Sequence, residues 1–542
     1  MRKILISVLM IAISSLAMAV EPVANYRVVP MPNSIECVKG KSFVLDSRTS
    51  IYYYGGEDMK RNAEFLEKYI EENLGLKLQV TDKKAKSHQI QLLLNSNSKN
   101  SHVMQANVEA YSLIVNERNI TLKGNSEAGV FYGIQTLRKS LPLEKGNATL
   151  PAVNITDEPR FGWRGMHLDC ARHFFSVDFV KEFIDILALH NMNTFHWHLT
   201  DDQGWRLELK RHPELTKIGA VRSGTVIGNN SDVDDGIPYG GFYTQRQVRE
   251  IVEYAKQRYI KVIPEIDVPG HAMAILAAHP ELGCTGGPYQ VGHKWGVYND
   301  VLCVGNPKTY DLMKDILDEV MELFPSETIH IGGDETPTVR WEQCEKCKVL
   351  ASPQGYFTKQ ITAYLEQKGH RAVCWDESLE KGIDQQTMIM SWRGTKPGIK
   401  AAEMGHDVIM TPLTHCYFDY YQTEKNSYEP SITGMWPISV EKVYGLEPVA
   451  DSLSVEVRSH IKGVQANVWT EQIGSGRVVE YMVLPRIGAL SEVGWTQPKR
   501  KEFKDYCERQ TRLTCLYEHF GWQYAKHLWP EKMVKDRWKI DN

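Results

Sequence analysis

Beyond Pro159, short apolar runs rich in β-branched residues alternate with stretches in which apolar positions recur every three or four residues. The first kind of run is typical of a buried strand, and the second of an amphipathic helix. Eight runs predict strands, at residues 165–169, 193–199, 261–267, 328–332, 372–375, 388–392, 408–412 and 464–469. Five helical patterns lie between or after them, at residues 177–190, 245–258, 310–323, 356–368 and 477–493. Eight strands in alternation with helices predict an α/β fold, a (β/α)8 barrel of the TIM type.

A doubly wound open sheet is the alternative to the barrel. Such a sheet usually carries a glycine-rich phosphate loop after its first strand. Here the first strand is followed by Cys170-Ala171-Arg172, without a glycine, which favours the barrel. The segment 413–462 is long and rich in aromatic residues, and we interpret it as an elaborated loop over the barrel mouth.

The chain before Pro159 mixes the two patterns differently. Residues 90–94 and 111–115 predict strands, and residues 60–73 and 128–140 predict helices, as in a separate α+β domain. We therefore expect four segments: a signal peptide at 1–19, a smaller α+β domain at 20–157, the barrel at 158–500, and a C-terminal helical tail at 501–542 packed on the barrel.

The first residues resemble a secretory signal. Arg2 and Lys3 precede an apolar run at 4–16, and Ala17-Met18-Ala19 offers a small-x-small cleavage site. The run is too short for a permanent membrane anchor. We expect a chain that is exported, periplasmic or secreted, and soluble after cleavage near Val20, without an integral membrane segment.

The composition narrows the class of partner. The chain is 42% hydrophobic and 24% charged, which suits large globular cores, and its net charge is −4. This balance gives no reason to expect nucleic acid or an anionic membrane as a partner. The oligomeric state stays open.

The strand at 328–332 ends in Gly332 and Gly333, which are followed by two adjacent carboxylates, Asp334 and Glu335. Glycines let a backbone turn sharply and approach a ligand closely. Two neighbouring carboxylates in different surroundings can divide into a protonated acid and an ionised partner near neutral pH. A solvated acidic turn is the alternative for the pair taken alone.

Most other strand ends also carry a carboxylate, a histidine or a tryptophan, and the active sites of TIM barrels lie at these ends. The residues are Asp169, His198, Asp201, Glu265, Asp267, Trp375, Asp376, Glu377, Trp392, Trp469 and Glu471. Carboxylates accept hydrogen bonds from hydroxyls, and indole faces cover the apolar face of a sugar ring. The pattern points to a glycoside hydrolase.

Several strings in this order resemble a β-N-acetylhexosaminidase of glycoside hydrolase family 20. They are WRGMHLDCARHF at 163–174, HWHLTDDQGWR at 196–206, PEIDVPGH at 264–271, HIGGDE at 330–335, WDE at 375–377, SWRG at 391–394, YFD at 417–419 and WTE at 469–471. The resemblance implies a barrel preceded by an α+β domain.

It also implies exo-acting, retaining hydrolysis of terminal β-linked GlcNAc or GalNAc, in which the sugar's own 2-acetamido oxygen is the nucleophile. By similarity, Glu335 is the general acid and base. Asp334 orients the acetamido group and stabilises its developing charge, and Tyr417 donates to the acetamido oxygen.

The remaining binding residues also follow from the resemblance. It assigns Arg164 and Glu471 to the ring hydroxyls, and Asp419 to the 4- and 6-hydroxyls. Trp375, Trp392 and Trp469 would wall the pocket. Asp201 and His271 would tune Glu335. The partner implied is a glycan with a terminal β-linked N-acetylhexosamine, and neither a cofactor nor a metal is implied.

Two other functions are compatible with part of this pattern. His196 and His198 lie two apart on a strand and would face the same side, as in a zinc hydrolase. The strand ends near Trp375, Trp392 and Pro412 supply no further histidine ligand except His415, a few residues into a loop. A non-catalytic glycan-binding protein would keep the tryptophans and lose the acid, yet Asp334 and Glu335 are both present.

The ten cysteines suggest disulfides in an exported chain. Cys284 and Cys303 flank a glycine-rich loop and could staple it. Cys344 and Cys347 form a CxxC. A zinc or redox role would need a second ligand pair or a thioredoxin-type context, and because neither lies nearby in the sequence, a small structural disulfide is favoured.

Overall fold

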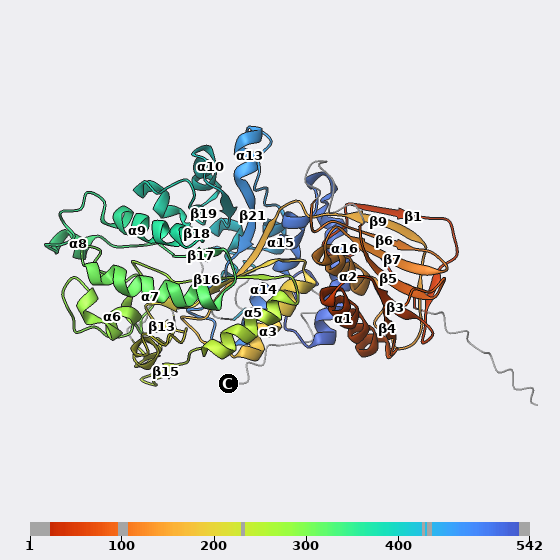
Figure 1. The fold of residues 1–542 in the computed structure, drawn as a ribbon, viewed down its shortest axis with the longest axis horizontal. Coiled ribbons are helices and arrows are strands. Elements are labelled where there is room, and N and C mark those ends of the chain that lie inside the picture. Colours follow the sequence, from red (N-terminus) through yellow and green to blue (C-terminus); the bar gives the residue numbers. More distant parts are fainter. Residues whose placement is uncertain (1–21, 96–106, 229–232, 425–428, 431–435, 530–542) are drawn as a thin grey trace, which may run out of the picture.

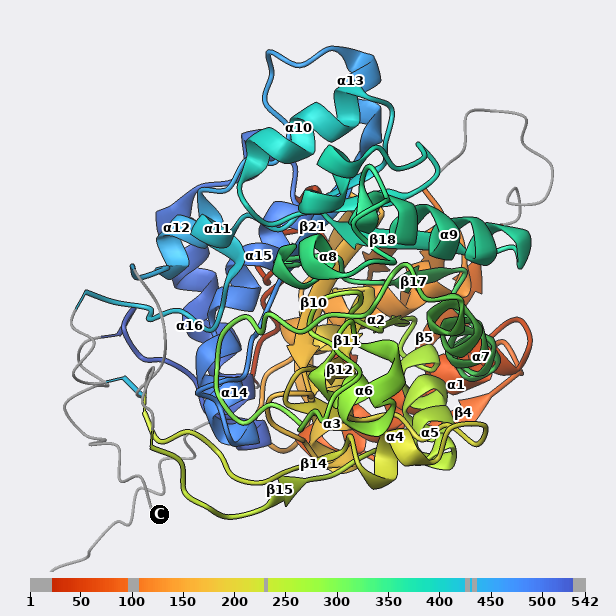
Figure 2. The same ribbon diagram turned by 90° about the vertical axis from the view of Figure 1, so that its left-hand side faces the viewer.

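The structure is a computed structural model, and it describes residues 22–95, 107–228, 233–424, 429–430 and 436–529. The expected signal peptide at 1–19 lies outside the described residues. In Figure 1 the barrel occupies the left of the molecule and the N-terminal sheet the right; Figure 2 views the molecule from the barrel side.

Eight parallel strands close into a barrel, which confirms the predicted fold. In order around the barrel they are β10 (Trp163–Asp169), β11 (Thr194–His198), β16 (Lys261–Glu265), β17 (Thr328–His330), β18 (Arg371–Trp375), β19 (Met388–Ser391), β20 (Val408–Met410) and β21 (Ile461–Ala466). Each predicted strand is present. The predicted ends differ from the observed ones by up to three residues, because the apolar pattern continues into the loops.

Helices follow most strands and cover the outside of the barrel. They include α3 (Val177–Leu189), α5 (Gln245–Lys256), α7 (Pro307–Leu323), α9 (Pro353–Gln367) and α10 (Thr395–Glu403). Ser176 caps the N-terminus of α3, where its side chain accepts from the backbone N–H of Phe179, and a capping box of Thr244 and Gln247 precedes α5. The four helices predicted between residues 177 and 368 are confirmed.

The helix predicted at 477–493 is wrong as a single element. The chain forms α14 (Gly476–Val483) and α15 (Arg486–Trp495), with Leu484 and Pro485 between them. Proline lacks the N–H that a helix interior needs, so Pro485 ends the first helix.

Shorter elements lie in the connections between the longer strands and helices. They are β12 (Thr200–Asp201), β13 (Gly204–Trp205), α4 (Glu214–Lys217), β14 (Val221–Arg222), β15 (Tyr239–Gly240), α6 (Met273–Ala278), η1 (Pro280–Leu282), α8 (Val339–Gln343), η2 (Asp376–Lys381), α11 (Leu413–Cys416), α12 (Val440–Tyr444), α13 (Val455–His460) and η4 (Pro498–Arg500). The segment 413–462 is therefore only partly the expected mouth loop, since α12 packs on α15 and α13 on α10.

The N-terminal unit is a seven-stranded mixed sheet in the order β1-β9-β6-β7-β5-β3-β4. Its strands are β1 (Ser34–Cys37), β3 (Ser50–Tyr53), β4 (Gln79–Thr81), β5 (Gln89–Leu94), β6 (Tyr111–Val115), β7 (Asn119–Gly124) and β9 (Val153–Asp157), and β2 (Phe43–Leu45) pairs separately with β8 (Ala148–Leu150). Helices α1 (Glu57–Leu74) and α2 (Glu127–Ser140) lie between the sheet and the barrel (Figure 1). The two strands and two helices predicted here are confirmed.

Polar side chains join the N-terminal unit to the barrel. Buried Lys139 of α2 donates to the carbonyl oxygen of Leu189, 3.0 Å away, at the end of α3. The indole N–H of Trp495 donates to Asp157 of β9 at 2.9 Å. Buried polar groups are stable only when they are partnered, so this interface requires both units.

The described part of the C-terminal tail is helical. α16 (Phe503–Phe520) packs on α15 through an ion pair of Arg509 with Glu492, and Tyr517 bonds to His190 at the end of α3 (2.6 Å). Residues 530–542 lie outside the description, and the division points at 158 and 501 stay predictions. No helix in the described ranges has the length and apolarity to cross a membrane.

Candidate active site

A sharp turn after β17 presents Asp334 and Glu335. Gly332 and Gly333 have φ angles of 64° and 90°, and Glu335 itself has a φ of 39°, all in the left-handed region. A Cβ atom at Gly332 would lie 1.7 Å from Oδ1 of Asp267, so only glycine fits there. The two glycines therefore set the directions of the two carboxylates, as the sequence predicts.

Asp334 and Glu335 both approach the same ring nitrogen of His271. The Nε2 atom of His271 lies 3.8 Å from Oδ2 of Asp334 and 3.8 Å from Oε2 of Glu335. The Asp334 side chain is 13% exposed and that of Glu335 is 47% exposed. Oδ1 of Asp334 is buried and has no hydrogen-bond partner within the described chain. It is thus ready to accept a donor from a ligand.

Behind His271 runs a line of buried polar groups. Nδ1 of His271 lies 3.2 Å from Oδ1 of Asp201, and Oδ2 of Asp201 lies 2.9 Å from Nε2 of His198. Nδ1 of His198 lies 2.5 Å from Glu265. The structure thus brings the predicted residues Asp201 and His271 together with Asp334 and Glu335.

Glu265 lies inside the barrel with no exposure and is surrounded by donors. His196 and His330 each lie 3.0 Å from its carboxylate, and the indole N–H of Trp375 donates to it at 2.9 Å. Burial raises the pKa of Glu265, but the neighbouring imidazoles outweigh burial and leave the pKa well below its usual range. The interior beneath the site is therefore a fixed, charged support.

The pKa shifts of Glu335, His271 and Asp201 differ in direction, which sets the protonation state of each group at the mouth. Burial and the charge of Asp334 raise the pKa of Glu335, so this carboxyl holds its proton to higher pH than an ordinary glutamate. Burial lowers the pKa of His271, but the charges of Asp201 and Asp334 outweigh it and raise the pKa well above 6.5. Burial raises the pKa of Asp201, but Arg172 and His271 outweigh it and lower the pKa well below its usual range. A cationic His271 therefore stands between Asp201 and the pair.

Aromatic residues line the neighbouring strand ends. Trp375 is buried at the end of β18, and its ring centroid lies 5.9 Å from that of partly exposed Trp469. Trp392, which follows β19, stacks on Tyr417 at 6.0 Å between ring centroids. Burial and the nearby Asp419 raise the pKa of Tyr417 well above 10, so its hydroxyl remains a proton donor.

Asp419, Glu471 and Arg172 form the polar side of the site. Burial and the charge of Glu471 raise the pKa of Asp419 well above its usual range, and its buried Oδ1 lacks a partner in the described chain. Burial also raises the pKa of Glu471, which Arg172 opposes. Arg172 lies over the ring of Trp469 at 5.1 Å and contacts Asp201 at 2.8 Å.

The structure contradicts the assignment of Arg164 to this site. Arg164 is the second residue of β10 and lies at the N-terminal end of the barrel, opposite the mouth. It is buried there, 2.7 Å from Glu109 of the N-terminal unit, and donates to the carbonyl oxygen of Asn191 at 2.8 Å. Arg172, three residues beyond the end of β10, reaches the mouth instead. Its position after the strand-end Asp169 was the available signal.

Glu377 is a further residue of the mouth, for which the sequence pattern predicts a strand-end position but no role. It accepts from the indole N–H of Trp392 at 2.9 Å. Burial and the charge of Asp334 raise its pKa to about 8. The signal was its place in Trp375-Asp376-Glu377 directly after β18.

The histidines that suggested a zinc hydrolase do face one side, as predicted. His196, His198 and His167 all point toward Glu265, and their side chains have no exposure. His167, His196 and Glu265 lie close enough to hold an ion, but all three side chains are fully buried, so a substrate could not reach an ion bound there. This geometry does not support a catalytic metal at these histidines.

Comparison with known proteins identifies the family. The sequence profile "Glycosyl hydrolase family 20, catalytic domain" matches residues 161–498, and "Glycosyl hydrolase family 20, domain 2" matches residues 25–158. This chain belongs to glycosyl hydrolase family 20. The first profile covers the barrel and the second covers the preceding α+β unit, the two parts that Figure 1 displays.

Individual family 20 proteins are similar over most of the chain. A beta-hexosaminidase of Porphyromonas gingivalis is 38% identical over 92% of this chain, which spans 64% of that protein's length, just under two thirds. The structure of a GH20 exo beta-N-acetylglucosaminidase from Vibrio harveyi in complex with N-acetylglucosamine aligns with a TM-score of 0.82 at 31% identity, covering 94% of this chain and 80% of that one. A GH20 beta-N-acetylhexosaminidase from Streptomyces coelicolor aligns with a TM-score of 0.79 at 29% identity, covering 92% and 97%.

Proposed function

We propose that this protein is an exo-acting, retaining β-N-acetylhexosaminidase that removes terminal, non-reducing β-linked GlcNAc or GalNAc by substrate-assisted catalysis. The observation that carries the proposal is the difference in surroundings between the two adjacent carboxylates after β17. Asp334 offers a buried, unpartnered oxygen, while Glu335 beside it has a raised pKa and a half-exposed carboxyl. One carboxyl suits a neutral N–H on the substrate, and the other suits proton transfer to a leaving group.

In the first step the carbonyl oxygen of the 2-acetamido group attacks the anomeric carbon. The glycosidic C–O bond breaks, and Glu335 gives its proton to the leaving oxygen. Asp334 accepts the acetamido N–H and stabilises the positive charge that develops on the oxazolinium ring. Tyr417 donates its hydroxyl hydrogen to the acetamido oxygen.

In the second step water attacks the anomeric carbon from the face that the leaving group left. Glu335, now ionised, takes a proton from the water, and the acetamido carbonyl reforms. Two inversions give retention at the anomeric carbon, and Glu335 returns to its starting protonation state.

Substrate binding would use the remaining mouth residues. Arg172 replaces Arg164 as the proposed donor to a ring hydroxyl, with Asp419 and Glu471 as acceptors. Trp392 and Trp469 would cover the apolar face of the sugar and the acetamido methyl group, over a floor made by Trp375. The names of the Porphyromonas and Vibrio relatives support an N-acetylhexosamine substrate and an exo mode of attack.

The deciding experiment compares an aryl β-N-acetylglucosaminide with the matching β-glucoside. Because the proposed nucleophile belongs to the acetamido group, the glucoside should react slower by several orders of magnitude. The matching β-N-acetylgalactosaminide tests the second sugar. Comparable rates on the glucoside would refute the mechanism.

We also propose that the protein is exported and acts on glycans outside the cytoplasm. The support is the sequence pattern at residues 1–19. Sequencing the N-terminus of the protein recovered from its native compartment should give a start near Val20. An intact Met1 on the bulk of the protein would contradict export through this signal.

A further inference from the structure

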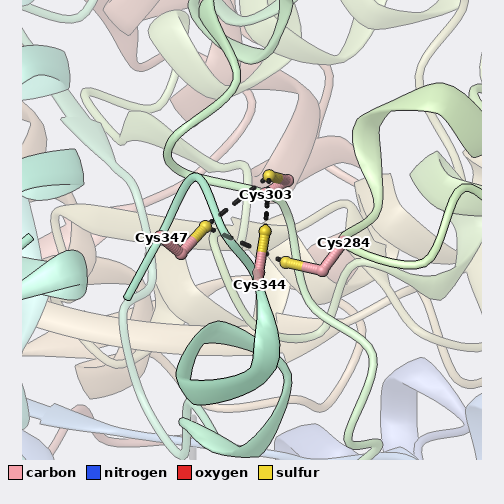
Figure 3. Close-up of side chains that lie close together, drawn as sticks. All are labelled: Cys284, Cys303, Cys344 and Cys347. Atoms are coloured by element: carbon pink, nitrogen blue, oxygen red, sulfur yellow. Dashed lines mark hydrogen bonds between the residues drawn. The ribbon is translucent and has the colours of Figure 1, made fainter. Parts of the chain in front are cut away.

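Four cysteine sulfurs meet at one point beside the barrel. Cys284 follows η1, Cys303 precedes α7, and Cys344 and Cys347 directly follow α8. All four sulfurs lie within 4.8 Å of one another, and Figure 3 shows them converging from two separate stretches of chain. All ten cysteines are free in the structure, so the prediction of structural disulfides is wrong.

The spacing of the sulfurs is that of a tetrahedral metal site. Sγ of Cys303 lies 3.7 Å from that of Cys344 and 3.6 Å from that of Cys347, and Sγ of Cys284 lies 3.9 Å from that of Cys347. Four sulfurs about 2.3 Å from a central zinc ion would be separated by about 3.8 Å. A disulfide would draw two sulfurs to about 2.0 Å and leave the others apart. Here Cys303 and Cys347 each have two sulfur neighbours at nearly equal distance.

The surroundings suit thiolate ligands in a closed site. Cys303, Cys344 and Cys347 are buried, and Cys284 is partly exposed. The backbone N–H of Gly305 donates to Sγ of Cys347 at 3.4 Å, a contact that stabilises sulfur charge. Four protein ligands leave no position for water or substrate, which is the pattern of a structural zinc ion. Cys284 and Cys303 supply the second ligand pair, which does not lie near the CxxC in the sequence.

The cluster lies between two loops that carry proposed catalytic groups. Cys344 comes nine residues after Glu335, and between them the indole N–H of Trp341 donates to the carbonyl oxygen of Leu302 at 2.9 Å. The N–H of Leu302 in turn donates to the carbonyl oxygen of Pro269 at 3.0 Å, two residues before His271. A metal ion at the cysteines would tie these loops together.

We propose that Cys284, Cys303, Cys344 and Cys347 bind one structural zinc ion, which fastens the loop after β17 to the loop after β16. The ion supplies no Lewis acid to the reaction. Its effect on hydrolysis, which rests on the proposed function, is to hold Glu335 and His271 in register. This revises the expectation of no bound metal.

Elemental analysis of the purified full-length protein tests the site without reference to activity. About one zinc ion per chain is expected after gel filtration, as in other sites with four cysteine ligands. The double variant Cys344→Ser/Cys347→Ser should lose it. Cys507→Ser, a partly exposed cysteine on α16, is the matched control and should keep it. Absence of metal in the wild type, stoichiometric iron, or disulfides among the four cysteines in a thiol count would each overturn the proposal.

Cobalt substitution keeps the test decisive if the double variant fails to fold. Wild-type protein loaded with Co²⁺ should develop the intense visible bands and sulfur-to-metal charge transfer of tetrahedral thiolate coordination. A spectrum of octahedral cobalt would refute the site.

The positioning effect has its own readout. In Cys284→Ser, which alters the partly exposed ligand, kcat should fall while KM for an aryl substrate stays close to that of the wild type, because misplacement by about 1 Å can cost up to 10²-fold in rate. A rise in KM alone would contradict positioning of the acid. A zinc-loaded protein without hydrolytic activity would refute the proposed function and leave the zinc site standing.

Discussion

Replacing His271 by glutamine should extend activity to higher pH. His271 is cationic near neutral pH because the charges of Asp201 and Asp334 raise its pKa, against the effect of burial. Its Nε2 lies 3.8 Å from Oε2 of Glu335. A cation at that distance favours the ionised carboxylate, so it lowers the pKa of Glu335, which burial and Asp334 raise.

The size of the effect follows from Coulomb's law. Two unit charges 3.8 Å apart interact by about 1 kcal/mol in water and about 4 kcal/mol at an effective dielectric constant of 20. Because the Glu335 side chain is 47% exposed, the smaller figure applies. Loss of the cation should therefore raise the proton affinity of Glu335 by a factor of about six.

The assay is the pH dependence of kcat/KM on a disaccharide, whose poor leaving group needs the proton. As the proposed general acid, Glu335 would act in its protonated form, so the rate should fall as pH rises through its pKa. His271→Gln should move this alkaline limb to higher pH. Asp334→Asn, which removes a neighbouring negative charge, should move it to lower pH. His279→Gln, which lies beside Glu214, should leave it in place. Movement of both site variants in the same direction would refute the charge arrangement.

Three further predictions concern the site. Glu335→Gln should lower the hydrolysis rate more for disaccharides than for aryl glycosides, by roughly 10²–10⁴-fold where the leaving group needs protonation. Asp334→Asn should lower the rate equally for both substrates and weaken the binding of a cyclic thiazoline inhibitor. Equal dependence on the leaving group in the two variants would show that the roles of Asp334 and Glu335 are assigned wrongly. Arg172→Lys should lower kcat/KM by roughly 10- to 100-fold, as expected for one charge-assisted hydrogen bond, whereas Arg164→Met should lower the melting temperature and leave KM unchanged; the opposite pattern in the two variants would restore Arg164 to the site. Short treatment with EDTA should leave the rate unchanged, because the proposed mechanism uses no metal at the substrate and the proposed zinc ligands are largely buried; immediate inactivation that zinc reverses would contradict this.

The barrel could be predicted because its strands are buried on both faces. Such strands are continuous apolar runs, and carboxylates such as Asp169 and Glu335 stand out where the runs end. The apolar pattern does not mark the last residue of a strand. The sequence predicts a strand at 464–469, yet β21 is Ile461–Ala466, because buried Val468 and partly exposed Trp469 continue the apolar pattern into the loop at the mouth.

The prediction that Arg164 belongs to the site is wrong because the motif alone does not show which end of the strand each of its residues occupies. It lies near the start of β10, whereas TIM-barrel sites form at strand ends. Counting from Asp169 at the end of the strand would have selected Arg172, because only residues at or beyond that point reach the mouth.

The cysteine cluster could not be predicted by local spacing. Cys303 and Cys344 are separated by 40 residues that include α7 and β17. Only the barrel topology, in which the loops after β16 and β17 are neighbours, brings the two pairs together. Spacing rules recognise zinc ligands when both pairs fall within a short stretch.

A barrel cut free at residue 161 would carry a buried cation without its counterion. Arg164 is 1% exposed and is neutralised by Glu109, which belongs to the other unit. Losing one partner of a buried ion pair costs about 3–5 kcal/mol, a large share of the stability of an ordinary domain. Conversely, buried Lys139 of α2 in the N-terminal unit would lose its hydrogen bond to the carbonyl oxygen of Leu189 at the end of α3. The barrel therefore cannot be expressed or transferred to another protein without the N-terminal unit. Substitutions on one side of this interface are constrained by the residues on the other side.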